Sequence, residues 1–351
     1  MGKTTETGEA GINLTELWEQ SRLQITDEFT TPPVILRVDE SIIGTLGNFS
    51  ASTGKAKSKK TFNICAIVAA ALANGTVLNY TASFPDEKRK ILYVDTEQSP
   101  FHCKRVLKRI LYLSELPTDI QPETLEFLSL RRYAPKIRLS IIEKAIYQTD
   151  GIGLVVIDGI RDLAYDINSP SEATELITKL MQWTDERQIH IHTVLHLNTG
   201  DDNTRGHLGT ELNNKAETIL QITKDEFDKD ISSVMAMCIR DIDFDPFAFR
   251  INDESLPELV ENYKPRQATT AKGFDYLEVP EAKHREALEN LFSNGDLISY
   301  TSLIPKLKEA YSGIGYSFGT NKAKLLKVFL ENKRMILKEG KSYRYNPDFH
   351  Y

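Results

Sequence analysis

The ten residues "TGKAKSKKTF", Thr53–Phe62, decide which fold we expect for this chain. Counted from Gly54, they follow the phosphate-loop pattern G-x-x-x-x-G-K-[ST], with Lys60 and Thr61 in register. One position departs from the pattern, because Lys59 stands where glycine is usual. Glycine tolerates backbone angles that lysine disfavours, so Lys59 is acceptable if its backbone is right-handed and its side chain points outward.

The sequence on either side gives this loop the context that it requires. "NFSAST" predicts a strand over 48–53, and "KTFNICAIVAAALAN" predicts a helix over 60–74 that ends at Gly75. Backbone N–H groups of such a loop bind phosphate oxygens, its lysine reaches the terminal phosphates, and its Ser/Thr holds magnesium. The expected phosphate-binding residues are Gly54, Lys55, Ala56, Lys57, Ser58, Lys59, Lys60, Thr61 and Phe62. A lysine-rich surface turn that binds nothing is the alternative.

Strand and helix patterns alternate from Pro32 onward. Strands are expected over 48–53, 91–95, 125–130, 153–158, 189–195, 217–223 and 232–239, and helices over 60–74, 99–113, 136–149 and 171–187. This alternation is typical of an α/β domain with a mainly parallel sheet. No helix pattern separates the last strands, so we expect that edge of the sheet to be antiparallel.

The remaining sequence predicts three further parts: an N-terminal arm with a helix over 1–30, a linker over 256–279 and a second domain over 280–351, leaving 31–255 for the α/β domain. The second domain has helix patterns over 281–293, 300–311 and 319–332, followed by a hairpin pattern over 335–347. Three helices and a hairpin in this order indicate a winged-helix domain.

Composition places the chain among ordinary globular proteins. Of its 351 residues 40% are hydrophobic and 26% are charged, and no run of eighteen apolar residues exists. The first ten residues lack the pattern of a secretory signal. Cys65, Cys103 and Cys238 are spaced for neither disulfides nor zinc. We therefore expect a cytoplasmic protein that makes no membrane contact.

Two acidic residues follow apolar strands and are candidates for chemistry on the phosphates. "ILYVDTEQS" (91–99) carries Glu97, which can orient or deprotonate an attacking water; the alternative is a helix cap. "GLVVIDG" (153–159) ends in Asp158, which together with Thr61 can hold Mg²⁺. Side chains at the carboxyl ends of parallel strands face the ligand crevice of an α/β sheet, which favours the functional interpretation of both residues.

His196 ends the next strand pattern, in "LHLNTG" (195–200), where it can sense the terminal phosphate. The alternative is a buried histidine with a structural role. His190, His192 and His196 alternate along one strand, but no carboxylate or cysteine partner is evident, so we do not expect a metal site there.

Together these segments resemble the RecA-like ATPases, in particular their RepA-type and replicative-helicase branch. The resemblance covers about residues 32–252 and rests on "GKAKSKKT", "YVDTEQS", "VVIDG" and "LHLNTG". It implies an ATP- and Mg²⁺-dependent motor that forms a ring, commonly a hexamer, and acts on DNA of plasmids, phages or mobile elements. The catalytic roles it implies fall on Lys60, Glu97, Asp158 and His196. The family pattern keeps the glycine that Lys59 replaces here.

The same resemblance implies an arginine that reaches the ATP of a neighbouring subunit. The family often has K-x-R near the end of a late strand, and "CIRD" (238–241) offers Arg240 with Cys238 in the lysine position. An arginine supplied from a neighbour stabilises negative charge on the transferring phosphoryl group. The alternative is an arginine paired with Asp241 or Asp243.

The C-terminal region is basic although the whole chain has a net charge of −7. Eight basic residues and two acidic ones lie between Gly319 and Arg344. Lysines favour contact with phosphates over contact with bases, so DNA binding there would be weakly sequence-specific and salt-dependent. The expected DNA contacts are Lys324, Lys327, Lys338, Lys341 and Arg344. A winged helix that binds protein is the alternative.

The sequence therefore leaves three functions open. The first is a DNA-dependent ATPase, a helicase or translocase. The second is an ATP-controlled DNA-binding switch with little turnover. The third is a scaffold whose ATP site is degenerate.

Overall fold

The computed structural model describes residues 7–8, 12–197, 206–225, 228–261, 263, 275–293, 295 and 297–349. The chain divides into two compact units, Met1–Pro265 and Arg266–Tyr351, which are described separately below. Among the described residues, no helix combines the length and the apolar character needed to cross a bilayer.

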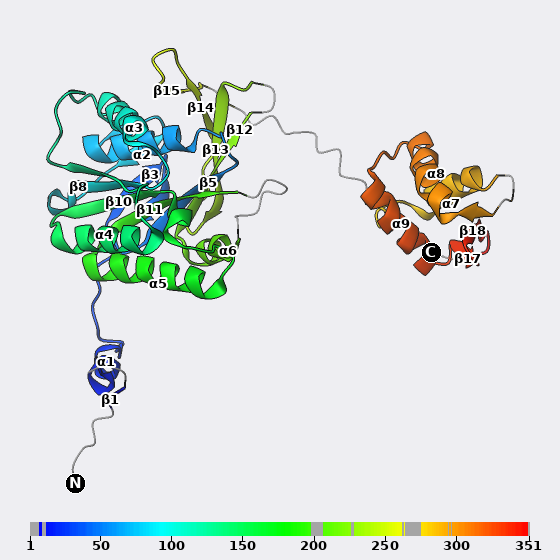
Figure 1. The fold of residues 1–351 in the computed structure, drawn as a ribbon, viewed down its shortest axis with the longest axis horizontal. Coiled ribbons are helices and arrows are strands. Elements are labelled where there is room, and N and C mark those ends of the chain that lie inside the picture. Colours follow the sequence, from blue (N-terminus) through cyan, green and yellow to red (C-terminus); the bar gives the residue numbers. More distant parts are fainter. Residues whose placement is uncertain are drawn as a thin grey trace, which may run out of the picture. The chain divides into compact units, whose positions relative to one another are not determined.

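A nine-stranded sheet forms the centre of the first unit (Figure 1). Its order is β15-β14-β13-β12-β5-β11-β10-β8-β9. The strands are β5 (Phe49–Gly54), β8 (Lys90–Asp95), β9 (Leu125–Ser129), β10 (Ile152–Asp158), β11 (His190–His196), β12 (Thr218–Lys224), β13 (Ile231–Ile239), β14 (Phe247–Ile251) and β15 (Pro257–Leu259). From β12 to β9 all neighbours are parallel, whereas β13, β14 and β15 are antiparallel. The predicted parallel sheet with an antiparallel edge is confirmed.

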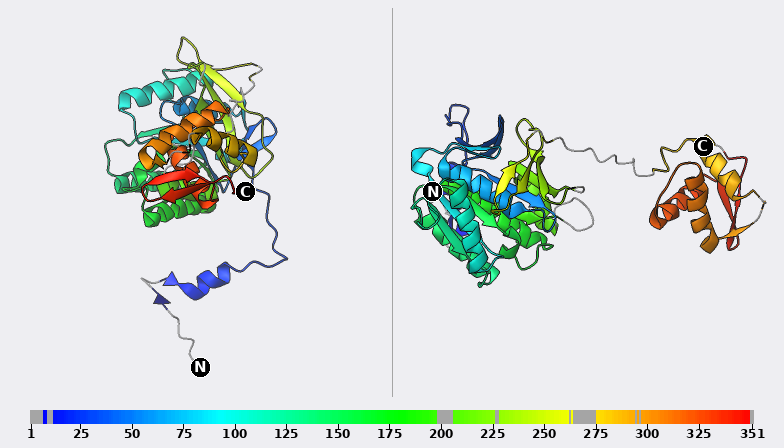
Figure 2. Two further views of the ribbon diagram at one scale, coloured as in Figure 1. Left: turned by 90° about the vertical axis from the view of Figure 1, so that its right-hand side faces the viewer. Right: turned by 90° about the horizontal axis from the view of Figure 1, so that it is seen from above.

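Helices cover both faces of this sheet (Figures 1 and 2). The helices are α2 (Lys60–Ala73), α3 (Pro100–Leu113), α4 (Pro135–Gln148), α5 (Pro170–Arg187) and α6 (Gly206–Lys215). One apolar cluster joins α2 and α3 to one face, and a second joins α4, α5 and α6 to the other. Burial of α2 is nearly complete, which explains its almost wholly apolar sequence.

Several elements of this unit have no clear pattern in the sequence. A second, four-stranded sheet has the order β4-β3-β7-β6, with β3 (Val34–Val38), β4 (Ser41–Thr45), β6 (Thr76–Val77) and β7 (Tyr80–Ala82). Short 3₁₀ turns, η1 (Asp86–Lys88) and η2 (Ile160–Leu163), precede β8 and follow β10. β15 lies inside the segment 256–279 that the sequence pattern assigned to a linker, so the sheet continues to Leu259.

The N-terminal segment contains the expected short helix. Asn13 is the N-cap of α1 (Leu14–Gln20), and its side chain accepts a hydrogen bond from the Glu16 backbone. The two short strands β1 (Thr7–Gly8) and β2 (Ile12–Asn13) pair with each other just before it.

The second unit contains three helices and a small sheet. In chain order these are α7 (Glu281–Leu291), β16 (Ile298–Ser299), α8 (Tyr300–Gly313), α9 (Thr320–Asn332), β17 (Ile336–Glu339) and β18 (Ser342–Tyr345). β17 and β18 form an antiparallel hairpin, and β16 pairs with β18. The core of the unit is built from buried side chains of all three helices and the hairpin, among them Leu303, Tyr311, Leu326 and Ile336.

Candidate functional site

The predicted nucleotide-site residues lie together at the carboxyl ends of four neighbouring strands of the large sheet. The order β5-β11-β10-β8 places four strand ends side by side. His196 is paired with Gly54, and Asp158 is paired with Val194 on one side and Asp95 on the other. The phosphate loop, His196, Asp158 and the turn with Glu97 are therefore close together, although Gly54 and His196 are more than 140 residues apart in the chain.

The phosphate loop runs from the end of β5 to the start of α2. The Lys60 ammonium group is folded into it and donates hydrogen bonds to the backbone oxygens of Gly54 and Lys55 at 2.8 and 2.9 Å. Burial lowers the Lys60 pKa to about 8, while the nearby charges of Asp158 and Glu97 oppose that shift. This buried cation at a helix N-terminus is suited to binding phosphate.

Two further features of the loop fit a phosphate group. The Ser58 hydroxyl is buried and has no hydrogen-bond partner among the described residues. A Cβ atom at Gly54 would lie 2.3 Å from the backbone oxygen of Ile222, so no larger residue fits there. An unpaired buried hydroxyl is costly, so a phosphate oxygen that enters the loop would gain a hydrogen bond from Ser58.

Lys59 does not have the right-handed backbone that would make it unstrained. Its φ is +67° and its ψ is +28°, in the left-handed region that favours glycine. Its side chain leaves the loop, and the ammonium group donates a 2.6 Å hydrogen bond to the Asp230 backbone oxygen before β13. Lys59 therefore adopts the left-handed conformation that glycine favours at this position, and its ammonium group is held away from Lys60.

Thr61, in the first turn of α2, and Asp158, at the end of β10, bring two side-chain oxygen atoms together beside the phosphate loop. The Thr61 hydroxyl lies 3.4 Å from Asp158 Oδ2, and the Tyr93 hydroxyl donates to the same oxygen at 2.9 Å. Burial, and then the charge of Asp95, raises the Asp158 pKa to about 7. One hydroxyl and one carboxylate facing the same point are ligands that fit Mg²⁺. Tyr93 was not predicted as a site residue. A polar hydroxyl inside the apolar strand pattern "ILYVD", two residues before Asp95, could have indicated it.

Glu97 is held by a tight turn after β8. The Asp95 carboxylate accepts hydrogen bonds from the backbone of Glu97 and of Gln98, at 3.0 and 2.7 Å, and from the Gln98 side chain at 2.9 Å. Glu97 Oε1 lies 3.5 Å from His196 Nε2. This contact with His196 holds the Glu97 pKa below its usual range. Glu97 is therefore ionised at neutral pH, as a general base requires.

His196 is neither fully buried nor fully paired. Its side chain is 33% exposed, and Nδ1 has no hydrogen-bond partner in the described part of the chain. Gly159 borders the same turn with φ +104°, and a Cβ atom there would lie 2.3 Å from the Thr96 hydroxyl and 3.0 Å from Glu97 Cγ. The glycine after Asp158 thus lets Glu97 and His196 meet.

Arg240 lies near the amino ends of the parallel strands, whereas the phosphate loop lies at their carboxyl ends. Its backbone N–H bonds to Glu217, whose own N–H bonds to Phe49 at the start of β5. Gly54 ends that strand, five residues further on, so Arg240 is about 17 Å along the sheet from its own phosphate loop. Its exposed guanidinium donates to the Lys215 backbone oxygen at 3.0 Å.

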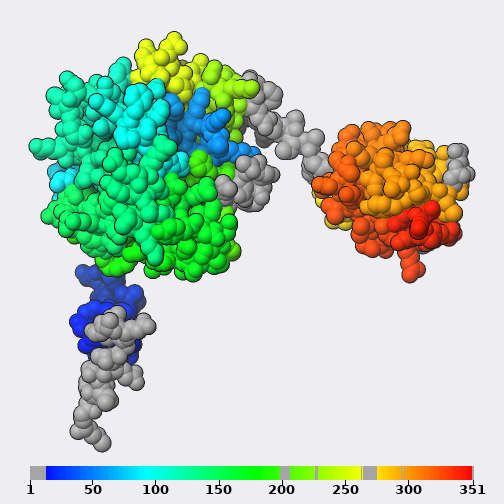
Figure 3. Space-filling model, viewed as in Figure 1, coloured from blue at the N-terminus to red at the C-terminus, as the bar shows by residue number. Residues whose placement is uncertain are grey.

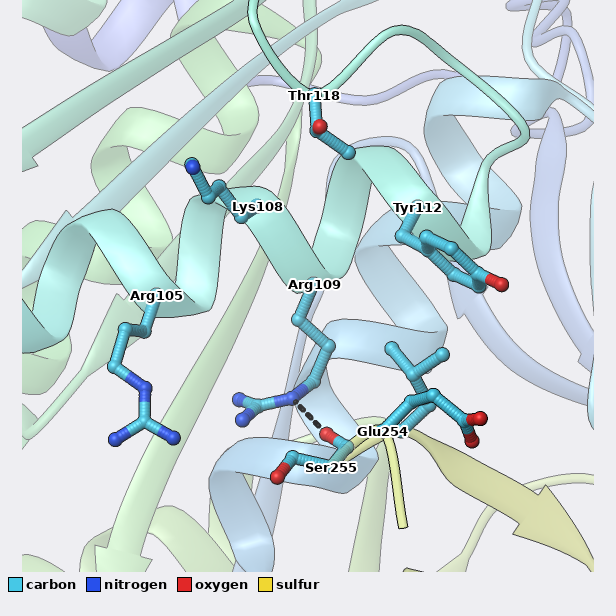
Figure 4. Close-up of a pocket in the computed structure, with 8 residues that line it drawn as sticks. Arg105, Lys108, Arg109, Tyr112, Thr118, Glu254 and Ser255 are labelled. Carbon is cyan, nitrogen blue, oxygen red and sulfur yellow. Dashed lines mark hydrogen bonds between the residues drawn. The ribbon is translucent and has the colours of Figure 1, made fainter. Parts of the chain in front are cut away.

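A hollow of about 280 Å³ lies beside the first turns of α2, between α3 and the turn before β15 (Figure 4). Arg105 and Arg109 extend from the same side of α3, and Arg109 points to Ser255 (Figure 4). Arg109 donates to the Ser255 backbone oxygen at 2.9 Å, and its guanidinium lies 3.9 Å from the centre of the Phe62 ring. Phe62 follows Thr61, so this hollow adjoins the phosphate site. The hollow was not predicted from the sequence, although the two arginines four residues apart on the helix after Glu97 could have indicated it.

The predicted DNA contacts of the second unit fall into two groups. Lys327 pairs with Glu331 and lies 4.9 Å from the centre of the Tyr343 ring, and Arg344 pairs with Glu339. Lys324, Lys338 and Lys341 are exposed and make no ion pair with any described residue. These three lysines are therefore more available to an external phosphate than Lys327 and Arg344.

Comparison with known families agrees with this geometry. The model of the AAA_25 family, described as an AAA domain, matches residues 20–202, more than half of the chain. The chain belongs to this family. The matched range of the AAA domain contains the phosphate loop, Glu97, Asp158 and His196, and it excludes Arg240 and the second unit. With its phosphate loop on β5 and its mostly parallel sheet, the AAA domain has the RecA-like P-loop fold, as predicted.

Solved structures similar to the chain include the RadB recombinase, with 17% identity and a TM-score of 0.43 over 62% of this chain and 92% of that one. Another is a KaiC-like protein from Pyrococcus horikoshii OT3, with 12% identity and a TM-score of 0.45 over 62% of this chain and 90% of that one. Among curated proteins, none matches the chain significantly.

Proposed function

We propose that this protein binds and hydrolyses ATP with Mg²⁺ and couples that reaction to DNA. The observation that supports it is that Lys60, Asp158 and Glu97 lie at or just beyond the carboxyl ends of β5, β10 and β8, three strands within a run of four neighbouring strands. A surface turn that binds nothing would not need a buried lysine, an unpaired buried hydroxyl and two carboxylates around it.

Each residue has a distinct part in the proposed reaction. Lys60 and the loop N–H groups hold the β- and γ-phosphates, and Thr61 and Asp158 hold Mg²⁺. Magnesium, when bound, offsets negative charge on the phosphates. Glu97 orients a water and accepts its proton at the carboxylate, while His196 holds Glu97 from the β11 side.

The hollow between Arg105 and Arg109 is the proposed place of the base. Its volume suits a purine, and guanidinium groups stack on flat rings. Arg109 is already fixed by Ser255 and Phe62, so binding a base there costs little side-chain entropy.

Replacing Arg105 by alanine tests this placement. We expect ATP to bind about tenfold more weakly, whereas inorganic tripolyphosphate, which has no base, binds as to the wild type. The control is Lys104→Ala, the loss of an exposed cation next to Arg105. Equal ATP affinities of the two variants, measured by calorimetry, would exclude the hollow as the base site.

Arg240 is proposed to act on the ATP of a neighbouring subunit. It is exposed, and its distance along the sheet prevents it from reaching its own phosphate loop. Head-to-tail packing of subunits would bring the surface with Arg240 of one subunit to the surface with the phosphate loop of the next. Head-to-tail contacts of this kind can close into rings. We therefore propose a homo-oligomer, with a hexameric ring as the specific expectation.

The second unit is proposed to be a winged-helix domain that contacts DNA phosphates. Its order of three helices followed by a hairpin supports this, as do the exposed Lys324, Lys338 and Lys341. In this proposal the protein is a helicase or translocase in replication or mobilisation of a plasmid or mobile element. An ATP-controlled DNA-binding switch is the second candidate, because the strained Lys59 loop is compatible with slow turnover.

The test is ATP hydrolysis by the full chain with Mg²⁺, with and without single-stranded DNA. Turnover that rises with DNA supports the motor. ATP binding with negligible turnover, combined with nucleotide-dependent duplex binding, supports the switch. Absence of any ATP-induced rise in melting temperature would contradict both and leave the scaffold.

A further inference from the structure

Two surface segments of the first unit combine basic and aromatic side chains. The turn from β9 to α4 carries exposed Arg131, Arg132, Tyr133 and Lys136. The part of the sequence around this turn, blue-green in Figure 3, forms much of the left side of the first unit in that view. The segment after β10 carries Arg161 and Tyr165, and the Tyr165 side chain is 64% exposed. None of the four cations forms an ion pair with a described residue.

Arg138 of α4 holds the two segments together. Its guanidinium donates to the backbone oxygens of Leu130, Arg131 and Asp162 at 3.1, 2.8 and 2.8 Å. The Asp162 carboxylate also lies 3.8 Å from Arg138. Because one partly buried arginine binds three carbonyl groups from both segments, their relative position is fixed.

Two nearby acidic side chains accept hydrogen bonds from the backbone. Glu172 accepts from the backbone N–H groups of Tyr165 and Asp166 at 2.8 and 3.3 Å, and Asp166 accepts from Asn168 at 2.8 Å. Lys136, Tyr165 and Glu175 line a hollow of about 240 Å³ between α4, η2 and α5. Within the two segments the four cations outnumber the one carboxylate, Asp162, so the segments themselves carry a net positive charge, with Asp166, Glu172 and Glu175 beside them.

The same segments connect to Glu97 through hydrogen bonds. The Thr96 hydroxyl lies 2.9 Å from the Gly159 oxygen and 3.2 Å from Asp162 Oδ2. Arg161 lies close enough that its charge contributes to lowering the Glu97 pKa. Movement of the segments bound by Arg138 would therefore displace Thr96 and the turn that carries Glu97.

From this arrangement we infer that Arg131, Arg132, Lys136 and Arg161 bind the phosphates of single-stranded nucleic acid, while Tyr133 and Tyr165 stack on its bases. This inference rests on the proposed ATPase function and locates a nucleic-acid contact on the ATPase unit itself. Unpaired cations interleaved with exposed tyrosines suit a single strand, whose bases are free to stack, better than a duplex. Arg138 is a positioning residue that carries the effect to Glu97.

The double variant Arg131→Ala/Arg132→Ala of the full chain tests this inference. We expect ATP turnover without DNA to stay at the wild-type value and stimulation by oligothymidylate to be lost. Loss of two phosphate contacts should also reduce the magnitude of the slope of log affinity against log salt by about 1.4. Arg131→Lys/Arg132→Lys keeps both charges and should retain stimulation. Lys90→Ala/Lys144→Ala is the control, since it removes two exposed cations from other positions of the unit.

The outcomes separate failure of this inference from failure of the proposed function. If the wild type neither hydrolyses ATP nor binds oligothymidylate, the proposed function and this inference both fall. If the wild type is stimulated and the alanine variant has the same stimulation and salt slope, only this inference is overturned. Loss of duplex binding with unchanged oligothymidylate binding would also overturn it.

Discussion

Replacing Glu97 by glutamine should lower ATP turnover by two to four orders of magnitude, the usual contribution of a positioned base, on the order of 10²–10⁴. The amide keeps the shape and the contact with His196 but cannot accept a proton. ATP affinity should stay near the wild-type value, because Lys60, Thr61 and Asp158 are untouched. Steady-state hydrolysis and equilibrium binding of a fluorescent ATP analogue measure the two effects separately.

The control for this prediction is Glu123→Gln, the same change at an exposed carboxylate before β9. Its turnover should equal that of the wild type. Because contact with His196 lowers the Glu97 pKa, its carboxylate stays ionised through the ordinary titration range of glutamate. Similar turnover in both variants would remove Glu97 from the reaction.

Replacing Lys60 by alanine should weaken ATP binding by about 100-fold, since a hydrogen bond to a charged group contributes about 1.5–3 kcal/mol. Hydrolysis should fall with it. The adjacent Lys59→Gly is the matched control and should change ATP affinity by less than about threefold. Its ammonium group is bound to Asp230, and glycine relieves a left-handed backbone that costs lysine about 1–2 kcal/mol.

The comparison of the two lysine variants answers whether Lys59 damages the loop. If Lys59→Gly bound ATP more than tenfold more tightly, with tenfold corresponding to about 1.4 kcal/mol, the extra lysine would be a defect. If it bound much more weakly, Lys59 would be a phosphate ligand despite its anchor. Melting temperatures of both variants are needed, because Lys60 also bonds the backbone of its own loop.

The periodicity of the sequence determined the core of the first unit. Apolar strands that end in polar residues, such as "ILYVD" and "GLVVID", can be buried only between helices, and the alternation with helices makes them parallel. Parallel strands have their carboxyl ends at the same edge, so the sequence alone placed Glu97 and Asp158 near the phosphate loop. The small second sheet was missed because its strands have two to five residues and little alternation.

Only the tertiary structure decided the contacts that join distant segments. The hydrogen bond from the Lys59 side chain to the Asp230 backbone depends on the turn before β13, 171 residues away. Tyr93 reaches Asp158, Arg109 covers Phe62, and Arg138 joins two segments because packing brings their elements together. Residue patterns report which face of an element is buried, whereas these pairings follow from strand order and side-chain packing.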